Sequence, residues 1–149
     1  MLDLVFQNFT ADKSLQKDFF ENIVKETLKE LRQNDKKVEV SINIVGEGRI
    51  RELNRKYRQK NKVTDVLSFP LGRESGFTQY GTIPLGDIFI CLPFAKKEAK
   101  RENIGIERKI AQLVVHGFLH LLGHKHEKSK IDAGKMLSLE SRILKHISY

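Results

Sequence analysis

The stretch IERKIAQLVVHGFLHLLGHKH, residues 106–126, carries the strongest pattern in the chain. It predicts a helix over residues 106–122, because apolar side chains cover most of a helical wheel drawn at about 100° per residue. His116 and His120 interrupt this apolar surface. They are four residues apart and therefore lie one above the other in a narrow polar slot. A helix that is apolar on most sides is expected at the centre of the fold.

The histidine pattern continues past the end of this helix as H-x-x-x-H-x-x-G-x-x-H. Gly123 is suited to end the helix in a left-handed conformation and to reverse the chain, and His126 follows three residues later. We expect His116, His120 and His126 to hold one metal ion, with His124 as the alternative third ligand. Three histidines leave a fourth tetrahedral position for water, as in catalytic zinc sites. The competing interpretation is a core histidine pair followed by solvent-exposed loop histidines.

Length and composition indicate an ordinary globular protein. With 149 residues, 40% hydrophobic and 31% charged, the chain is expected to form one domain over residues 1–149. No apolar stretch approaches the roughly 20 residues of a membrane span, and MLDLVFQNF at the N-terminus lacks the features of a secretory signal. We therefore predict a cytoplasmic protein with no membrane role. Cys91 is the single cysteine, so a metal would be bound by nitrogen and oxygen ligands.

Alternating periods along the chain predict an α+β fold, a small mixed sheet of about four strands covered by helices. The metal site is expected on the central apolar helix and the loop after it. The patterns predict strands around residues 4–6, 38–44, 66–70 and 85–92, and helices around residues 15–31, 50–57, 94–104, 106–122 and 131–146. Pro70 and Pro93 are expected to end the third and fourth strands.

The formal charge of +8 is concentrated in GRIRELNRKYRQKNK, residues 48–62, which has seven basic residues and one acid. Such a run is typical of a nucleic-acid-binding surface, although a solvated helix face followed by a basic loop has the same composition. The helical spacing of Ile50, Leu53 and Tyr57 predicts that they share one face, with the basic side chains mostly opposite. With no Trp and three Tyr, we expect contacts with phosphates rather than an aromatic stacking platform.

The histidine spacing is similar to that of the metzincin proteases, but the two differ at one position. In those proteases a glutamate follows the first histidine and acts as the general base, whereas this chain has Gly117. A protease is therefore the least favoured interpretation.

HGFLHLLGHKH, residues 116–126, closely resembles the signature of the YbeY family of bacterial endoribonucleases and rRNA maturation factors, which has this glycine. LNRKYRQKNKVTDVLSFPL, residues 53–71, is similar to a second block of the family and contains its TDVLSF core. LGDI at residues 85–88 and MLSLESRIL at residues 136–144 are similar to two weaker blocks. The family commonly has Tyr-Asp before the third histidine, where this chain has His124 and Lys125.

The resemblance implies a single-strand-type endoribonuclease that acts in small-subunit ribosomal RNA maturation by metal-assisted phosphodiester hydrolysis. Its partners would be ribosomal RNA and the small ribosomal subunit or its assembly factors. The cofactor would be one Zn²⁺ ion, although histidine ligands also accept nickel, copper or cobalt. A zinc ion on three neutral histidines makes hydroxide available near pH 7, and the RNA's own 2′-hydroxyl is the other nucleophile to consider.

Within that interpretation, Arg58, His116 and His120 are the predicted catalytic residues. Arg58 matches the characteristic arginine of the family, and a guanidinium is suited to hold a phosphate oxygen in two-point fashion. We expect Asp65 and Ser68 to brace the adjacent loop and His146 to lie on the surface of the last helix. The alternative function is a non-catalytic, metal-stabilised RNA-binding assembly factor, which would differ from the enzyme in lacking turnover.

Overall fold

The computed structural model describes residues 2–71, 81–123, 130–147 and 149, with the side chains of residues 130–133 left out. These residues form four strands and five helices, so the predicted α+β class is confirmed. The strands are β1 (Leu2–Asn8), β2 (Val38–Val45), β3 (Val66–Pro70) and β4 (Ile83–Cys91), and the helices are α1 (Lys17–Glu30), α2 (Glu47–Arg58), α3 (Leu92–Glu102), α4 (Ile106–Leu121) and α5 (Lys130–Leu144).

Element boundaries differ from the predictions at two prolines. Pro84 lies inside β4, which starts at Ile83 rather than at Leu85. Pro93 lies in the first turn of α3 instead of simply ending the strand. Proline is tolerated in a first helical turn because the amide that it lacks has no partner within the helix there. The helix predicted from Leu15 begins at Lys17.

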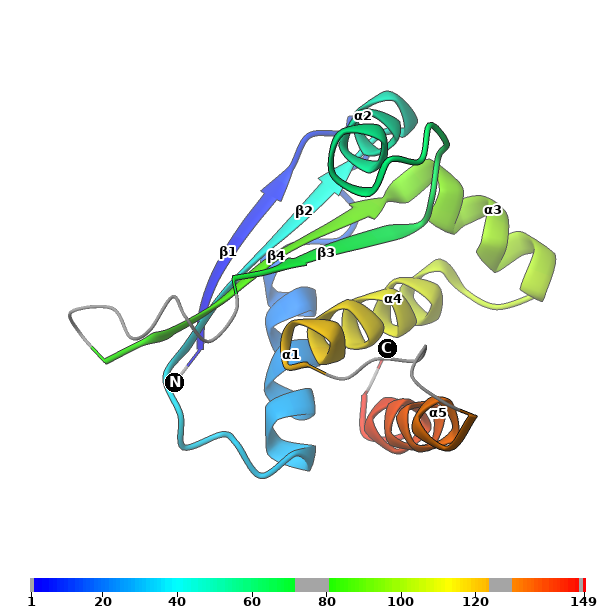
Figure 1. Ribbon diagram of the computed structural model, residues 1–149. Helices are drawn as coiled ribbons and strands as arrows, with labels where there is room; N and C mark the ends of the chain where they lie inside the picture. Colours follow the sequence, from blue (N-terminus) through cyan, green and yellow to red (C-terminus); the bar gives the residue numbers. More distant parts are fainter. Residues whose placement is uncertain (1, 72–80, 124–129, 148) are drawn as a thin grey trace.

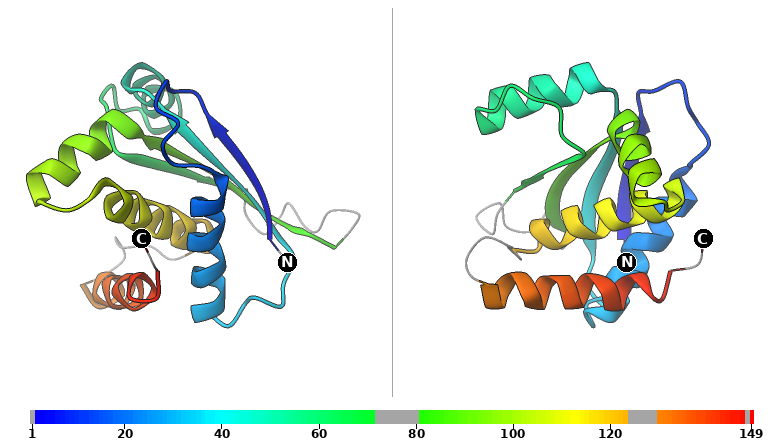
Figure 2. Two further views of the ribbon diagram at one scale, coloured as in Figure 1. Left: turned by 180° about the vertical axis from the view of Figure 1, so that it is seen from behind. Right: turned by 90° about the vertical axis from the view of Figure 1, so that its right-hand side faces the viewer.

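The sheet is mixed, with strand order β1-β2-β4-β3. β1, β2 and β4 are parallel, and β3 pairs antiparallel to β4 and forms one edge. Figure 1 shows α1 and α4 below the sheet and α2 above it. The turned views in Figure 2 show α5 alongside α4 on the side away from the sheet. The histidine helix α4 therefore lies between the sheet and an outer helix.

Most of the core lies between the sheet and the helices α1, α4 and α5. Alternate residues of the strands point toward these helices, among them Ile42, Ile44, Ile88 and Ile90, each at most 3% exposed. The opposite face of the sheet has a smaller core under α2, made of Val45, Ile50, Leu53, Leu67 and Cys91. The two faces consequently carry apolar clusters of different size.

Gly86 of the LGDI segment allows the edge strand to pair with β4. The register between β2 and β4 shifts here, so that Leu85 is an extra residue in β4. Gly86 has a φ of +136°, and a Cβ atom on it would collide with the carbonyl oxygen of Phe69. Only glycine permits this approach of the two strands.

Candidate active site

The two predicted helical ligands lie side by side on α4. The ring centroids of His116 and His120 are 4.3 Å apart, and both side chains are partly buried. Their neighbours on the helix, including Val115 and Leu119, are fully buried. The apolar pattern of the helix thus fixes its orientation, and the four-residue spacing brings both imidazoles to one side of it.

A carboxylate from α5 orients the first histidine. Nδ1 of His116 lies 2.9 Å from Oε1 of Glu140, whose side chain is 15% exposed. Because a carboxylate oxygen accepts hydrogen bonds, Nδ1 donates, and Nε2 is the nitrogen with a lone pair. Carboxylates commonly set the tautomer and orientation of metal-ligating histidines in this way. The sequence analysis did not single out Glu140, although MLSLESRIL, which contains it, was one of the family-like blocks.

Gly117 lies where α4 packs on Ile88 of β4. A Cβ atom on Gly117 would lie 3.2 Å from Cγ2 of Ile88, closer than side chains normally pack. A Cβ atom at this position would therefore press against Ile88 of the sheet. Glycine at position 117 avoids this contact and lets α4 pack closely on β4.

The described residues contribute two of the three predicted metal ligands. His126 and its alternative His124 lie outside the described residues. Within residues 2–71, 81–123 and 134–147, no group of three His, Cys, Asp or Glu side chains gathers as a metal site. The pair nonetheless fits a zinc ion in its chemistry. Two adjacent imidazoles, one of them held by a carboxylate, are a donor set that zinc prefers.

Arg58 is the last residue of α2 and lies against the edge strand. Its Nη2 donates a hydrogen bond of 2.6 Å to the carbonyl oxygen of Ser68. Its guanidinium carbon lies 4.9 Å from the ring centroid of Phe69, a cation–π distance. The arginine is exposed, yet two contacts with β3 hold its planar group.

The carbonyl bound by Arg58 belongs to the free edge of the sheet. The amide of Cys91 donates to the carbonyl oxygen of Asp65 at 2.8 Å, so Asp65 faces β4. Antiparallel pairing alternates, and the carbonyl of Ser68, three residues later, therefore faces outward. Arg58 thus satisfies an acceptor that would otherwise be open on an edge strand.

The side chains of β3 alternate between the two faces of the sheet. Ser68 pairs with Ile88, whose side chain packs against Gly117, so the Ser68 side chain is on the histidine face. Leu67 and Phe69 instead pack in the cluster under α2. The edge at Ser68 is consequently the border between the Arg58 side and the histidine side of the sheet.

A polar cluster braces the start of β3. The side chain of Asp65 accepts a hydrogen bond of 2.7 Å from the amide of Val66, in agreement with its predicted bracing role. Burial and a hydrogen bond to Asp65 raise the pKa of Glu98 to about 7. Nζ of Lys109, a buried residue of α4, lies 2.7 Å from Glu102 and 3.9 Å from Glu98. This group of charges connects α3, α4 and the TDVLSF segment.

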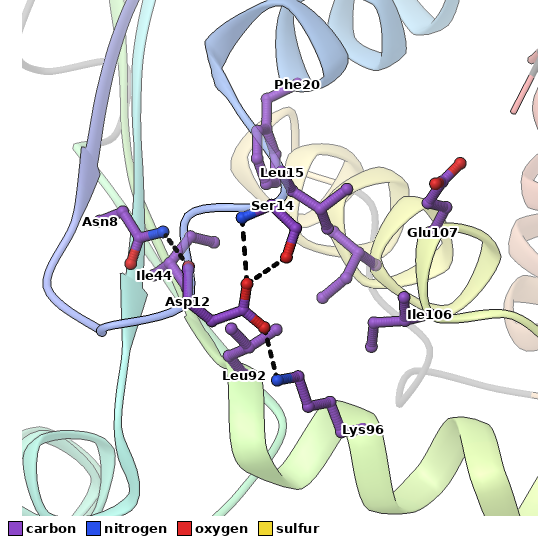
Figure 3. A pocket seen from close by; sticks show the side chains of 11 residues that line it. Asn8, Asp12, Ser14, Leu15, Phe20, Ile44, Leu92, Lys96, Ile106 and Glu107 are labelled. Atoms are coloured by element: carbon purple, nitrogen blue, oxygen red, sulfur yellow. Dashed lines mark hydrogen bonds and ion pairs between the residues drawn. The ribbon is translucent and has the colours of Figure 1, made fainter.

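A cavity of about 100 Å³ lies elsewhere, between the end of β1, the loop after it and the starts of α3 and α4. Figure 3 shows Asp12 at this cavity, bonded to Ser14 and to Lys96. The hydrogen bond from Lys96 is the main reason that the pKa of Asp12 lies below its usual range. These polar groups satisfy one another, and none of the predicted site residues within the described chain lines the cavity.

Two further predicted positions are described. His146 follows α5, is 58% exposed on its side chain and lies 3.6 Å from a Glu30 carboxylate oxygen, so its predicted surface location is confirmed. Cys91 is fully buried, and burial raises the pKa of its thiol. Among the helices of the described residues, none has the length and hydropathy to cross a membrane.

The chain matches known proteins over nearly its whole length. The family model described as "Endoribonuclease YbeY" matches residues 5–148. A protein of that name from Persephonella marina is 40% identical over 137 residues, covering 92% of this chain and 87% of the relative. One from Aquifex aeolicus is 39% identical over 136 residues, covering 91% and 87%. A solution structure from Thermotoga maritima superimposes with a TM-score of 0.64 at 25% identity, over 95% of this chain and 87% of the other.

The family resemblance found in the sequence is therefore confirmed. Endoribonucleases are hydrolases whose substrate is RNA, and the predicted class of enzyme is confirmed at the level of the family. The chain belongs to the endoribonuclease YbeY family.

Proposed function

We propose that the chain hydrolyses phosphodiester bonds of ribosomal RNA during maturation of the small ribosomal subunit, in the cytoplasm and with one Zn²⁺ ion. His116 and His120 would hold the ion together with His126. The observation that carries this proposal is the adjacent imidazole pair, with ring centroids 4.3 Å apart and Nδ1 of His116 bonded to Glu140. When bound, a zinc ion would stabilise negative charge on a phosphate oxygen and make water nucleophilic near neutral pH.

The hydrogen bond between His116 and Glu140 is proposed to fix the orientation of the first metal ligand. The carboxylate holds the ring of His116 in the tautomer whose Nε2 carries a lone pair. Burial of Val115 and Leu119 around the pair limits rotation of the helix face that carries it. A rigid arrangement of ligands reduces the reorganisation needed when the substrate reacts.

Arg58 is proposed to bind the phosphate that flanks the reacting bond. A guanidinium has five N–H donors, and its one bond to Ser68 does not exhaust them. Stacking on Phe69 keeps the group planar against the edge of the sheet before RNA arrives. An arginine held in this way loses little side-chain entropy on binding a phosphate.

The test is cleavage of ribosomal RNA by purified protein, compared with metal-stripped protein and with the His116→Ala and Arg58→Ala variants. Cleavage is expected to vanish in all three. His146→Ala and Arg142→Ala are matched controls, since each removes an exposed histidine or arginine whose contact in the described chain is the Glu30 carboxylate, away from α2. Both controls should cleave as the wild type does.

Equal cleavage in every sample would point to a contaminating nuclease and contradict the proposal. No cleavage in any sample, combined with metal-dependent stability and RNA binding, would favour the non-catalytic assembly factor. Zinc content is measured on each preparation, so that loss of metal and loss of Arg58 are distinguished.

A further inference from the structure

A row of aromatic rings crosses the sheet edge on the face opposite the histidines. The centroids of Tyr57 and Phe69 are 5.3 Å apart, and those of Phe69 and Phe89 are 5.8 Å apart, both in edge-to-face geometry. The three rings belong to α2, β3 and β4. The row therefore joins the end of the basic helix to the sheet.

Tyr57 is far more exposed than the two apolar residues that share its face of α2. Ile50 and Leu53, on the same predicted face of α2, are at most 8% exposed, whereas Tyr57 is 50% exposed. Its ring neighbour Phe69 belongs to the edge strand, beyond which the described chain places no further strand. Half of an aromatic side chain therefore faces solvent at the end of this helix face.

Two basic side chains contact the rings of this aromatic row. Nζ of Lys56 lies 5.3 Å from the ring centroid of Tyr57, and the guanidinium of Arg58 is stacked on Phe69. The basic residues of this segment are all exposed: Arg49, Arg51, Arg55, Lys56, Arg58, Lys60 and Lys62. Glu47 and Glu52 are the acids between residues 47 and 62. An exposed ring within a positively charged surface is complementary to nucleic acid, whose bases stack and whose phosphates are anionic.

We infer that Tyr57 is a base-stacking residue, and that single-stranded RNA binds along α2 with its phosphates on the basic side chains and one base on the Tyr57 ring. This inference rests on the proposed function, because it takes RNA as the substrate. The strand must be single, since the bases of a duplex already stack on one another and expose no face to a protein ring.

The edge strand β3 separates the inferred RNA-binding surface on α2 from the histidines. Arg58 binds the outward carbonyl of Ser68, and the Ser68 side chain is on the histidine face of the sheet. RNA that stacks beside Arg58 and crosses this edge would pass from the aromatic row to the face that carries His116. The aromatic row would thus position the substrate, while the histidine side carries out the chemistry.

The experiment is fluorescence anisotropy with a labelled single-stranded RNA of about ten nucleotides, its integrity checked on a gel after each titration. Tyr57→Ala is expected to weaken binding roughly 5- to 100-fold, the range found for loss of one stacking partner. Tyr57→Phe, which keeps the ring, should bind within about twofold of the wild type. Tyr57→Leu keeps the apolar bulk but has no aromatic face, so it should bind RNA as poorly as Tyr57→Ala does. Its melting temperature should equal that of the wild type, which shows that the fold is intact.

Three comparisons separate stacking from charge and from general damage. Tyr149→Ala removes another exposed tyrosine, 54% exposed at the C-terminal end, and should not change binding. Lys56→Ala should lower the slope of log affinity against log salt by about 0.7, whereas Tyr57→Ala should leave the slope unchanged. Duplex RNA of the same sequence should bind all Tyr57 variants equally.

Wild-type affinity in Tyr57→Ala, or equal weakening for single-stranded and duplex RNA, would overturn the inference. Cleavage is assayed separately with His116→Ala. Histidine-dependent cleavage with Tyr57-independent binding would overturn only the stacking role. Tyr57-dependent binding without any cleavage would overturn only the proposed hydrolysis.

Discussion

The two faces of the sheet are built in different ways. On the histidine face, α4 is so close to β4 that a Cβ atom at position 117 would crowd Ile88, and helices α1 and α5 complete a large core. On the other face, α2 covers a small cluster and leaves Tyr57 half-exposed among cations. Dense packing suits metal-binding side chains that need a fixed geometry, because atoms in a closely packed interior resist displacement. A flexible polyanion is better met by side chains that remain accessible to solvent.

The largest effect is expected at Gly117, where the histidine helix packs closely on β4. Gly117→Leu should lower the free energy of unfolding by about 3 kcal/mol or more, because the new side chain must displace Ile88. Chemical denaturation measures this. Gly134→Leu is the matched control on α5, where an added Cβ meets nothing within 4 Å, and it should be neutral or stabilising by up to about 1 kcal/mol. Equal effects of the two substitutions would contradict the tight contact between position 117 and Ile88.

The next effect concerns the charges that join the histidine helix to the start of β3. The folded protein holds a proton on Glu98 up to about pH 7, whereas the ordinary pKa of this side chain is 4.5. Unfolding therefore releases a proton in this window, and the free energy of unfolding should fall by up to about 3 kcal/mol as pH rises from 4.5 to 7.

Glu98→Gln should remove this part of the pH dependence, because glutamine does not titrate and its amide can still donate to Asp65. Unfolding free energies measured at several pH values in both proteins test the prediction. Glu107→Gln, an exposed position on α4, serves as the control and should follow the wild-type curve. A Glu98→Gln curve parallel to that of the wild type would contradict the assignment.

A smaller effect is expected from the outer layer of the histidine face. Glu140→Ala should weaken zinc affinity roughly 10- to 100-fold, because the ring of His116 loses the carboxylate that sets its tautomer. Competition with a metal chelator measures the affinity. Glu30→Ala is the matched control. This carboxylate also contacts α5, with Oε1 2.6 Å from Nε of Arg142, but it is not the carboxylate that His116 bonds. Unchanged zinc affinity in Glu140→Ala would show that the carboxylate from α5 does not contribute to the metal site.

The smallest effect on stability is predicted for the open face. Arg58→Ala should cost at most about 1 kcal/mol of unfolding free energy, because exposed cation–π contacts and surface hydrogen bonds contribute little. Thermal denaturation tests this beside the cleavage assay. A large loss of stability would mean that Arg58 supports the fold and would weaken its assignment to RNA. Together with Gly117→Leu, this variant shows whether stability and substrate contact are separated between the faces.

Much of the histidine side could be predicted from the sequence because its signals are local. The spacing of His116 and His120 places both imidazoles on one side of any helix that contains them. The apolar surface around them required a buried helix, and α4 is one. The capping role of Asp65 was likewise readable, since it acts on the very next amide.

The features that the sequence did not reveal involve contacts between distant segments. Tyr57 follows the helical period of Ile50 and Leu53, but the period does not tell where the sheet ends beneath the helix. Glu140 is 24 residues from its partner, so no spacing rule connects it with His116. Lys109 interrupts an apolar pattern, and only the approach of α3 shows that Glu98 and Glu102 neutralise it.

By itself, the sequence determined the class of fold, the family, the central helix and the pairing of two histidines on it. These depend on composition and on periods of a few residues, which local geometry converts directly into faces and sides. Only the tertiary structure decided which carboxylate orients His116, why a glycine fits best at position 117, and that Tyr57 stays in solvent beside Arg58. These depend on how closely separate elements approach one another, and the backbone closes such distances only when the whole core packs.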